Sequence, residues 1–159
     1  MHLQSRITVF VAIGGLLALM GGLFVYVDNT PSLQSAQIEL YNVELLSSNT
    51  IDNSAELSVS FMVTNPSDTT FTVSSITYEL YADDIQLGSS SYSTEDISMP
   101  GRAAFYPEAQ IPLKSKILIS ADTENAQIIE KIIDGMDIEY TVTGILTLQT
   151  TWSTTDVKF

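Results

Sequence analysis

Two pairs of adjacent carboxylates are the residues whose types and spacing could support chemistry. Asp83-Asp84 and Glu95-Asp96 stand side by side in the chain, and close carboxylates can act as general acids and bases or ligate calcium. Neither pair has the alternating Asp spacing of a calcium loop. Asp83-Asp84 also lies between two apolar stretches, where a hairpin turn is required and aspartate is favoured. We therefore predict no metal site and no cofactor.

Nucleophilic catalysis needs a base beside the attacking group. The sequence has no cysteine and one histidine, His2, which an apolar segment separates from the rest of the chain. Lys114 and Lys116 remain as formal bases, but they follow a strand-like stretch at 109–113, and we interpret them as solvated loop charges. There is no phosphate loop and no dinucleotide fingerprint. The sequence thus predicts a protein that is not an enzyme.

The net charge of -13 restricts the possible partners, because all 19 carboxylates follow Val27. Such a surface repels nucleic acid and anionic lipid. Nucleic acid is therefore not an expected partner. A cationic partner or an apolar lipid contact stays open.

Alternation of apolar and polar residues dominates the stretch 57–113. This two-residue period is typical of strands with one buried face. Three such runs, separated by turn residues, predict an antiparallel β-sandwich. The apolar members are Leu57, Val59, Phe61 and Val63, then Ile76, Tyr78, Leu80 and Ala82, then Phe105, Ala109, Ile111 and Leu113.

The flanking stretches add a bulge, a helix and a bent strand. Apolar residues change phase between Leu40 and Tyr41, which predicts a bulge or bend in the first strand. At 122–135 four isoleucines share one helical stripe, with Asp122 or Thr123 as cap and Gly135 at the end. Gly144 interrupts an alternation at 138–148 and is expected to bend a long strand. Val157 and Phe159 close the last strand.

An apolar run from Ile7 to Val27 precedes the domain, with 21 residues in a row free of charge. As a helix it spans about 31 Å, close to the roughly 30 Å hydrocarbon core of a bilayer. A cleaved signal peptide is the alternative, but its apolar core would be shorter, so we predict a retained single-pass anchor. Arg6 before the run and Asp28 after it place the N terminus in the cytoplasm and the domain outside the cell.

The predicted organisation is therefore a cytoplasmic tail at 1–6, a transmembrane signal anchor at 7–27, a linker at 28–35 and a β-sandwich domain at 36–159. Within the anchor, Gly14, Ala18 and Gly22 stand four residues apart. Small residues at this spacing allow close approach of a second helix. They suggest a homo-oligomer or a protein partner within the cell membrane.

Four short motifs follow one another in the chain: the Asn65-Pro66-Ser67 turn, the alternating stretch 71–84, Leu87-Gly88 and the run 97–113. Their order resembles the LEA type 2 domain, also called the water-stress and hypersensitive-response (WHy) domain. Ser67 and Asp83-Asp84 depart mildly from that family's usual pattern. The resemblance implies an immunoglobulin- or fibronectin-like sandwich with one short helix and a role in stress or desiccation tolerance. The residues that match the family signature are Asn65, Pro66, Tyr78, Leu80, Tyr81, Gly88, Pro100 and Gly101, and their expected role is structural.

Aromatic residues on several strands allow two interpretations, a ligand groove or ordinary core packing. Tyr81 and Tyr106 are the better candidates for an exposed contact surface. The others in this set are Tyr78, Phe105, Tyr140 and Trp152.

The functional hypotheses follow from these features. The first is a membrane-anchored module that protects or binds surfaces without turnover. The second is a structural subunit of a membrane or cell-surface assembly, since archaeal filament proteins share the plan of an apolar helix before a β-sandwich. The third is carriage of lipid or another apolar ligand in a cleft between the sheets.

Overall fold

The computed structural model describes residues 14–18, 33–93 and 103–159. The chain divides into two units, Met1–Ser32 and Leu33–Phe159. Residues 14–18 are helical, whereas the rest of the predicted anchor, including Gly22, lies outside the described residues. Within the described ranges, no helix has the length and apolar character needed to cross a bilayer.

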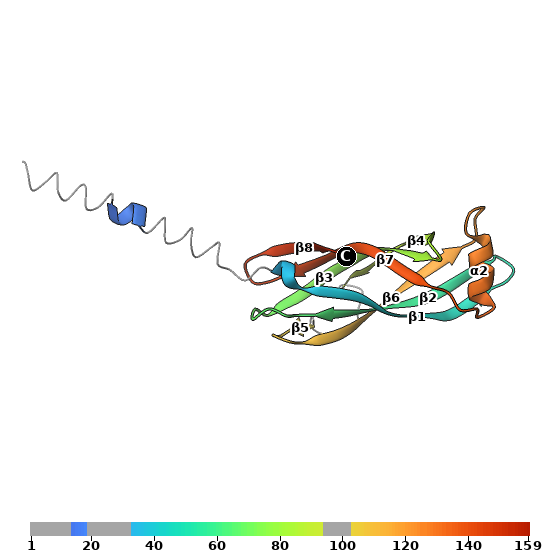
Figure 1. Ribbon diagram of the computed structural model, residues 1–159, viewed down its shortest axis with the longest axis horizontal. Helices are drawn as coiled ribbons and strands as arrows, with labels where there is room; N and C mark the ends of the chain where they lie inside the picture. The colour runs from blue at the N-terminus through green and yellow to red at the C-terminus, as the bar shows by residue number, and fades with distance from the viewer. Residues whose placement is uncertain (1–13, 19–32, 94–102) are drawn as a thin grey trace, which may run out of the picture. The chain divides into compact units, whose positions relative to one another are not determined.

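The second unit consists of two antiparallel sheets that lie one over the other (Figure 1). The first sheet has the order β1 (Gln37–Asn49), β2 (Ser54–Thr64) and β6 (Gln110–Ser120). The second has the order β4 (Ile85–Ser93), β3 (Phe71–Ala82), β7 (Tyr140–Gln149) and β8 (Thr154–Lys158), and β5 (Ala104–Phe105) pairs with β3. The predicted mainly β, antiparallel architecture is confirmed. Its immunoglobulin-like subclass stays a prediction.

The core lies between the sheets and is built from the predicted alternation. Leu57, Val59, Phe61 and Val63 of β2 are fully buried, as are alternate residues of β3. The Phe61 ring meets the Tyr78 ring edge-on, with centroids 4.9 Å apart, a geometry that aromatic pairs favour. This contact joins the central strands of the two sheets.

The domain begins earlier than the predicted boundary at Ala36. A 3-10 helix, η1 (Leu33–Ser35), contacts β8. The Leu33 side chain is buried in the same core as the strands. Apolar burial therefore places Leu33 within the compact unit.

The predicted bulge in the first strand is confirmed. In the pairing of β1 with β2, Leu40 faces Phe61 and Asn42 faces Ser60, so Tyr41 is the extra residue and is 66% exposed. A second shift, between Leu45 and Ser47, was not predicted. The first bulge returns Val43 to the core side, where it packs with Leu40 against the buried residues.

Helix α2 (Ala126–Ile133) is shorter than the predicted stretch, and its N-cap is Asn125 rather than Asp122 or Thr123. The Asp122 carboxylate instead accepts hydrogen bonds from the backbone N–H groups of Glu124 and Asn125. Asp122 and Thr123, which were expected to cap the helix, therefore belong to a turn that precedes it. Gly135 follows the helix with φ of +70°, as a helix end requires.

The run at 105–113 is not one strand, contrary to the prediction. β5 ends at Phe105 and β6 begins at Gln110. Pro107 has no N–H to donate, and Glu108 has φ of +64°, so the backbone turns between them. β6 then continues past Leu113, which places Lys114 and Lys116 on a strand rather than in a loop.

The predicted hairpin at Asp83-Asp84 is confirmed, since Ala82 pairs with Ile85 across it. Both aspartates have positive φ, 47° and 65°, as a type I′ turn requires. We expect Asp84→Gly to raise the free energy of unfolding by up to about 1 kcal/mol, because glycine adopts this conformation without strain. Urea unfolding measures the change.

Asp83→Gly is the matched control for that turn. Asp83 pairs with Lys131 at 3.6 Å and accepts a hydrogen bond from the backbone N–H of Glu139. The substitution removes both contacts, so its gain should be smaller than that of Asp84→Gly. A larger gain at Asp83 would contradict the assignment.

Candidate functional site

Asn65, the first residue of the predicted family signature, is completely buried where β2 ends. Its side-chain N–H group donates to the carbonyl oxygens of Thr69, at 2.9 Å, and Phe105, at 2.8 Å. Its side-chain oxygen accepts from the N–H and the hydroxyl of Ser67. The Asn65 amide therefore closes the loop that follows β2 and joins it to Phe105 of β5.

The backbone of Asn65 also bonds to the segment between β5 and β6. Its N–H donates to Ala109, and its carbonyl accepts from Glu108. Asn65 therefore links the end of β2 to both sides of the β5–β6 turn. Pro66, which has no backbone N–H, follows it.

The other described signature residues are also placed by packing. Tyr78 and Leu80 are buried core residues of β3. Tyr81 lies on the same strand and donates its hydroxyl to Glu79 at 2.7 Å. Gly88 pairs with Leu80 next to a register shift and has φ of +157°. Pro100 and Gly101 lie outside the described residues.

A hydrogen bond crosses the core from one sheet to the other. The Tyr78 hydroxyl donates to the Ser115 hydroxyl of β6 at 3.1 Å. Burial raises the pKa of Tyr78 above its ordinary value of 10.0, and its hydrogen bonds with Ser115 and Ser90 offset this only in part. The folded state therefore keeps this proton at a higher pH than the unfolded chain does.

This difference predicts an alkaline loss of stability. Because the folded-state pKa is the higher one, the contribution is complete below pH 10 and disappears as pH rises through the folded-state pKa. We expect Tyr78→Phe to lower the free energy of unfolding by about 1 kcal/mol at pH 7 and to flatten its decline above pH 10. Urea unfolding at several pH values measures both effects.

Ser115→Ala separates the effect of Tyr78 titration on stability from the effect of losing the Tyr78–Ser115 hydrogen bond. It removes the same bond but keeps the phenol buried, so the alkaline decline should be at least as steep as in the unaltered protein. Equal slopes for Tyr78→Phe and the unaltered protein would contradict the role given to Tyr78.

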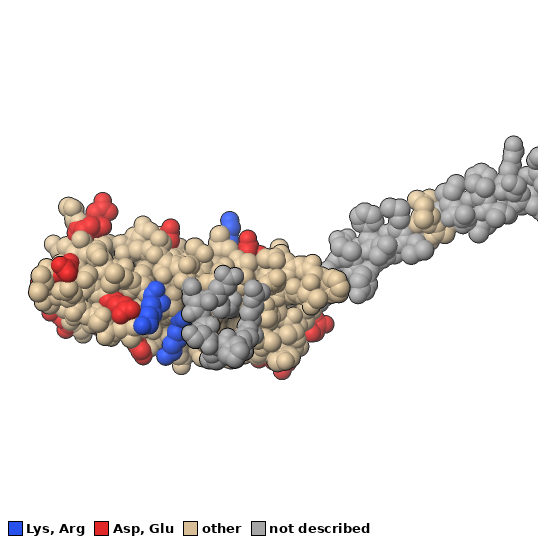
Figure 2. Space-filling view, turned by 180° about the vertical axis from the view of Figure 1, so that it is seen from behind, with Lys and Arg blue, Asp and Glu red and all other residues tan. Residues whose placement is uncertain are grey.

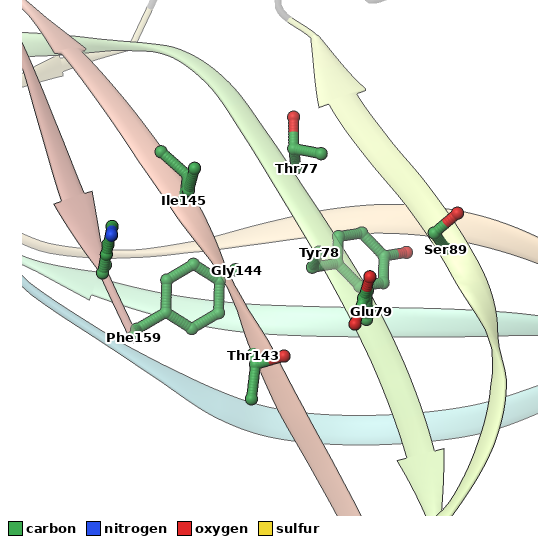
Figure 3. A pocket seen from close by; sticks show the side chains of 9 residues that line it. Thr77, Tyr78, Glu79, Ser89, Thr143, Gly144, Ile145 and Phe159 are labelled. Carbon is green, nitrogen blue, oxygen red and sulfur yellow. The ribbon is translucent and has the colours of Figure 1, made fainter.

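A groove of about 490 Å³ lies over the five-stranded sheet (Figure 3). Every strand residue in its lining comes from that sheet, so it is a surface feature and not a cleft between sheets. Its lining carries the hydroxyls of Thr77, Thr143 and Ser89. The charged residues of the lining are Glu79 and Lys158. The Glu79 carboxylate is already held by Tyr81. The groove was not predicted from the sequence, because it depends on Gly144 and Phe159 meeting across two strands.

The carboxylate pairs of the sequence do not form a convergent site in the described residues. Asp83 and Asp84 line a small depression with Glu139 and Thr141. Within 14–18, 33–93 and 103–159, no three acidic or histidine side chains are close enough to hold a metal ion. Glu95-Asp96 lies outside the described residues.

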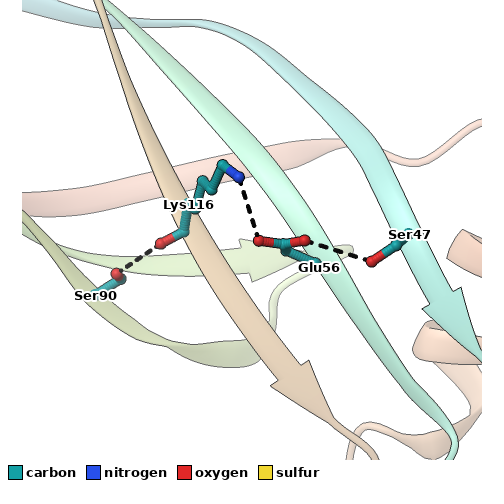
Figure 4. A network of polar contacts seen from close by, with 4 residues as sticks. All are labelled: Ser47, Glu56, Ser90 and Lys116. Carbon is teal, nitrogen blue, oxygen red and sulfur yellow. Dashed lines mark hydrogen bonds and ion pairs between the residues drawn. The ribbon is translucent and has the colours of Figure 1, made fainter.

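Lys116 belongs to a polar network on the three-stranded sheet and not to a reactive centre (Figure 4). Its ammonium lies 3.6 Å from Glu56, which also accepts a hydrogen bond from Ser47. The Ser90 hydroxyl of β4 donates to the backbone carbonyl of Lys116 at 3.0 Å. That last bond ties the adjoining edges of the two sheets.

A model of the late embryogenesis abundant family LEA_2 matches residues 60–159, well over half of the chain. The chain belongs to the LEA_2 family. The resemblance drawn from Asn65, Pro66 and the β3 pattern is thereby confirmed. Membership associates the protein with stress.

Solved structures resemble the LEA_2 fold at low identity. A protein described as ApaA from Bordetella pertussis has a TM-score of 0.50 and 8% identity, over 79% of this chain and 88% of that chain. A protein from Arabidopsis thaliana has a TM-score of 0.49 and 14% identity, over 77% and 80%. One described as a late embryogenesis abundant protein has a TM-score of 0.45 and 15% identity, over 99% and 87%. The likeness to ApaA shows the fold alone. A search of curated proteins gives no match.

The exposed aromatic residues of the LEA_2 domain only partly follow the prediction. Tyr106 is 66% exposed, as expected, whereas Tyr81 is half-buried. Trp152, which was grouped with core or groove residues, is 93% exposed. It lies in the turn between β7 and β8, which the alternation of the neighbouring residues does not reveal.

Proposed function

We propose that this LEA_2 protein is a non-enzymatic module, anchored in the cell membrane, that binds surfaces through its folded sandwich and protects them during water loss. The observation that carries the proposal is the family match over residues 60–159. The hydrogen bonds of Asn65 support the proposal. A disordered chain does not hold a side-chain amide buried with its hydrogen bonds satisfied, so this feature indicates a protein that acts in its folded state.

That the protein catalyses no reaction is proposed because its polar side chains are bonded to other parts of the fold. The Asn65 amide, the Tyr78 hydroxyl and the Glu56–Lys116 pair each have partners within the fold. Their chemistry serves stability and sheet packing. The protein therefore acts by contact and needs no cofactor.

The membrane anchor is proposed on the length of the apolar run Ile7–Val27. Such an anchor is a single pass with the N terminus in the cytoplasm and the domain outside. Gly14, Ala18 and Gly22 would then offer a surface for a second copy or a protein partner. Alkaline carbonate extraction of membranes and protease treatment of intact cells test these points. A protein released by carbonate, or one protected in intact cells, contradicts the anchor or the outward orientation, respectively.

Protection by the folded surface has its own test. Dye-loaded vesicles carrying the full chain should leak less after drying and rehydration than vesicles without it. Asn65→Ala, which destabilises the fold, should lose that effect, whereas Asn42→Ala should keep it. Asn42 bonds only to the exposed Glu44 carboxylate and makes a matched control. Equal protection by the Asn65 variant would contradict a role for the folded state.

A further inference from the structure

Trp152 is the only tryptophan of the chain and is 93% exposed at the tip of the β7–β8 turn. The turn is closed by backbone N–H donation from Thr150 to the Ser153 carbonyl at 2.9 Å and from Ser153 to the Thr150 hydroxyl at 3.1 Å. The ring is therefore held outward by a hydrogen-bonded turn. Removing so large an apolar ring from water is favourable, so a contact at this position would be stabilising.

Tyr106, 66% exposed, lies on the same end of the domain. Phe105, its neighbour, pairs with Phe71 at the start of β3. The next residue, Thr72, donates its hydroxyl to the carbonyl of Gln149 at the end of β7. The two exposed aromatic residues therefore stand on adjoining loops, which we call the aromatic end.

The chain also enters the domain at the aromatic end. Helix η1 contacts β8, which follows directly on the Trp152 turn (Figure 1), and its residue Leu33 is only 6% exposed. Five residues, 28–32, separate this fixed point from Val27, the end of the apolar run. Fully extended, the chain from Val27 to Leu33 spans about 20 Å. With the run in a bilayer, the aromatic end cannot leave the vicinity of the membrane.

Carboxylates gather at the end of the domain opposite the aromatic end. The turns 50–53, 83–84 and 121–125, helix α2 and the segment 134–139 form the opposite end and hold nine of the 19 carboxylates. Among the described residues, the loops 65–70, 106–109 and 150–153 of the aromatic end hold two, Asp68 and Glu108. Figure 2 shows more acidic side chains toward the α2 end of the face in view. On this count of described residues, the aromatic end carries fewer carboxylates and meets less repulsion from lipid phosphates.

We propose that the aromatic end is a lipid-contacting surface, with Trp152 inserted in the headgroup region of the bilayer that holds the anchor and Tyr106 beside it. Trp and Tyr favour this region because each has an apolar body and a polar hydrogen-bonding group. The inference rests on the proposed membrane anchor. It adds that the sandwich stands on the membrane with its acidic end directed away, so that the acidic end is the one presented to other partners.

Fluorescence of the single tryptophan tests this orientation. The full chain is reconstituted in phosphatidylcholine vesicles and first checked by flotation. We expect Trp152 emission to be blue-shifted relative to the detergent-free unfolded chain, to be quenched by brominated lipid, and to be shielded from aqueous iodide. The expected quenching by brominated lipid is the same whether the domain lies inside or outside the vesicle, because the aromatic end stays next to the anchor.

A matched reporter at the opposite end is Ile51→Trp combined with Trp152→Phe. Ile51 is 92% exposed in the β1–β2 turn, so its tryptophan should be quenched by iodide and not by brominated lipid. A floating chain whose Trp152 behaves like this control overturns the orientation alone. A chain that fails to float contradicts the membrane anchor and the orientation with it.

Discussion

Asn65→Ala should lower the free energy of unfolding by about 2–4 kcal/mol. The side chain is completely buried and makes four hydrogen bonds. Removing it takes the amide donor from buried backbone groups such as the Phe105 carbonyl, and a buried group left unsatisfied costs about 1–3 kcal/mol. Urea unfolding followed by circular dichroism measures the loss.

Asn65→Asp distinguishes lost donors from lost volume. The substituted carboxylate keeps the acceptor for Ser67 but faces the carbonyl oxygens of Thr69 and Phe105 with no hydrogen to donate. Its neutral form is therefore favoured in the folded state, which raises its pKa, and stability lost at pH 7 should partly return as pH falls. Asn65→Ala should show no such recovery. If Asn65→Ala stayed within about 0.5 kcal/mol of the unaltered protein, as expected for exposed Asn42→Ala, Asn65 would not have the role assigned to it.

The strands of the sandwich could be predicted because apolar residues alternate with the strand period. The bulge at Tyr41 followed from the change of phase between Leu40 and Val43. The Asp83-Asp84 hairpin followed from turn residues between two such runs. These signals are local, since each depends on residues within one strand and the turn beside it.

Contacts between distant segments could not be predicted in this way. Asn65 and Phe105 are 40 residues apart in sequence, and nothing near Asn65 indicates that its amide reaches a second strand. The Lys114 and Lys116 error had a different cause. The alternation of β6 continues through Ile117 and Ile119, so the lysines are its outward-facing members and the strand did not end at Leu113.

Gly144 shows the same limit, because the alternation around it predicts a bend but does not reveal how closely other residues pack against it. A Cβ at this position would overlap the backbone carbonyl oxygen of Thr77 and approach the Phe159 ring to 2.8 Å. Gly144 and Phe159 exchange backbone hydrogen bonds of 2.9 and 3.1 Å, and the Phe159 ring continues inward to Phe61 at 6.0 Å. Figure 3 shows the ring beside the Gly144 backbone. A tertiary contact, invisible in the local pattern, excludes a side chain here.

Gly144→Ala should therefore lower the free energy of unfolding by about 3 kcal/mol or more, at or beyond the upper end for overpacked cores. Gly135→Ala is the control for conformation alone, since a Cβ there meets nothing within 4 Å but φ is +70°; about 1–2 kcal/mol is expected. Adding Phe159→Ala to Gly144→Ala should recover little, because the Thr77 carbonyl belongs to the backbone and cannot turn aside. Urea unfolding of these variants measures the losses of stability. If Gly144→Ala lost no more stability than Gly135→Ala, β3 and β7 would separate easily at this point and the close packing would not be important.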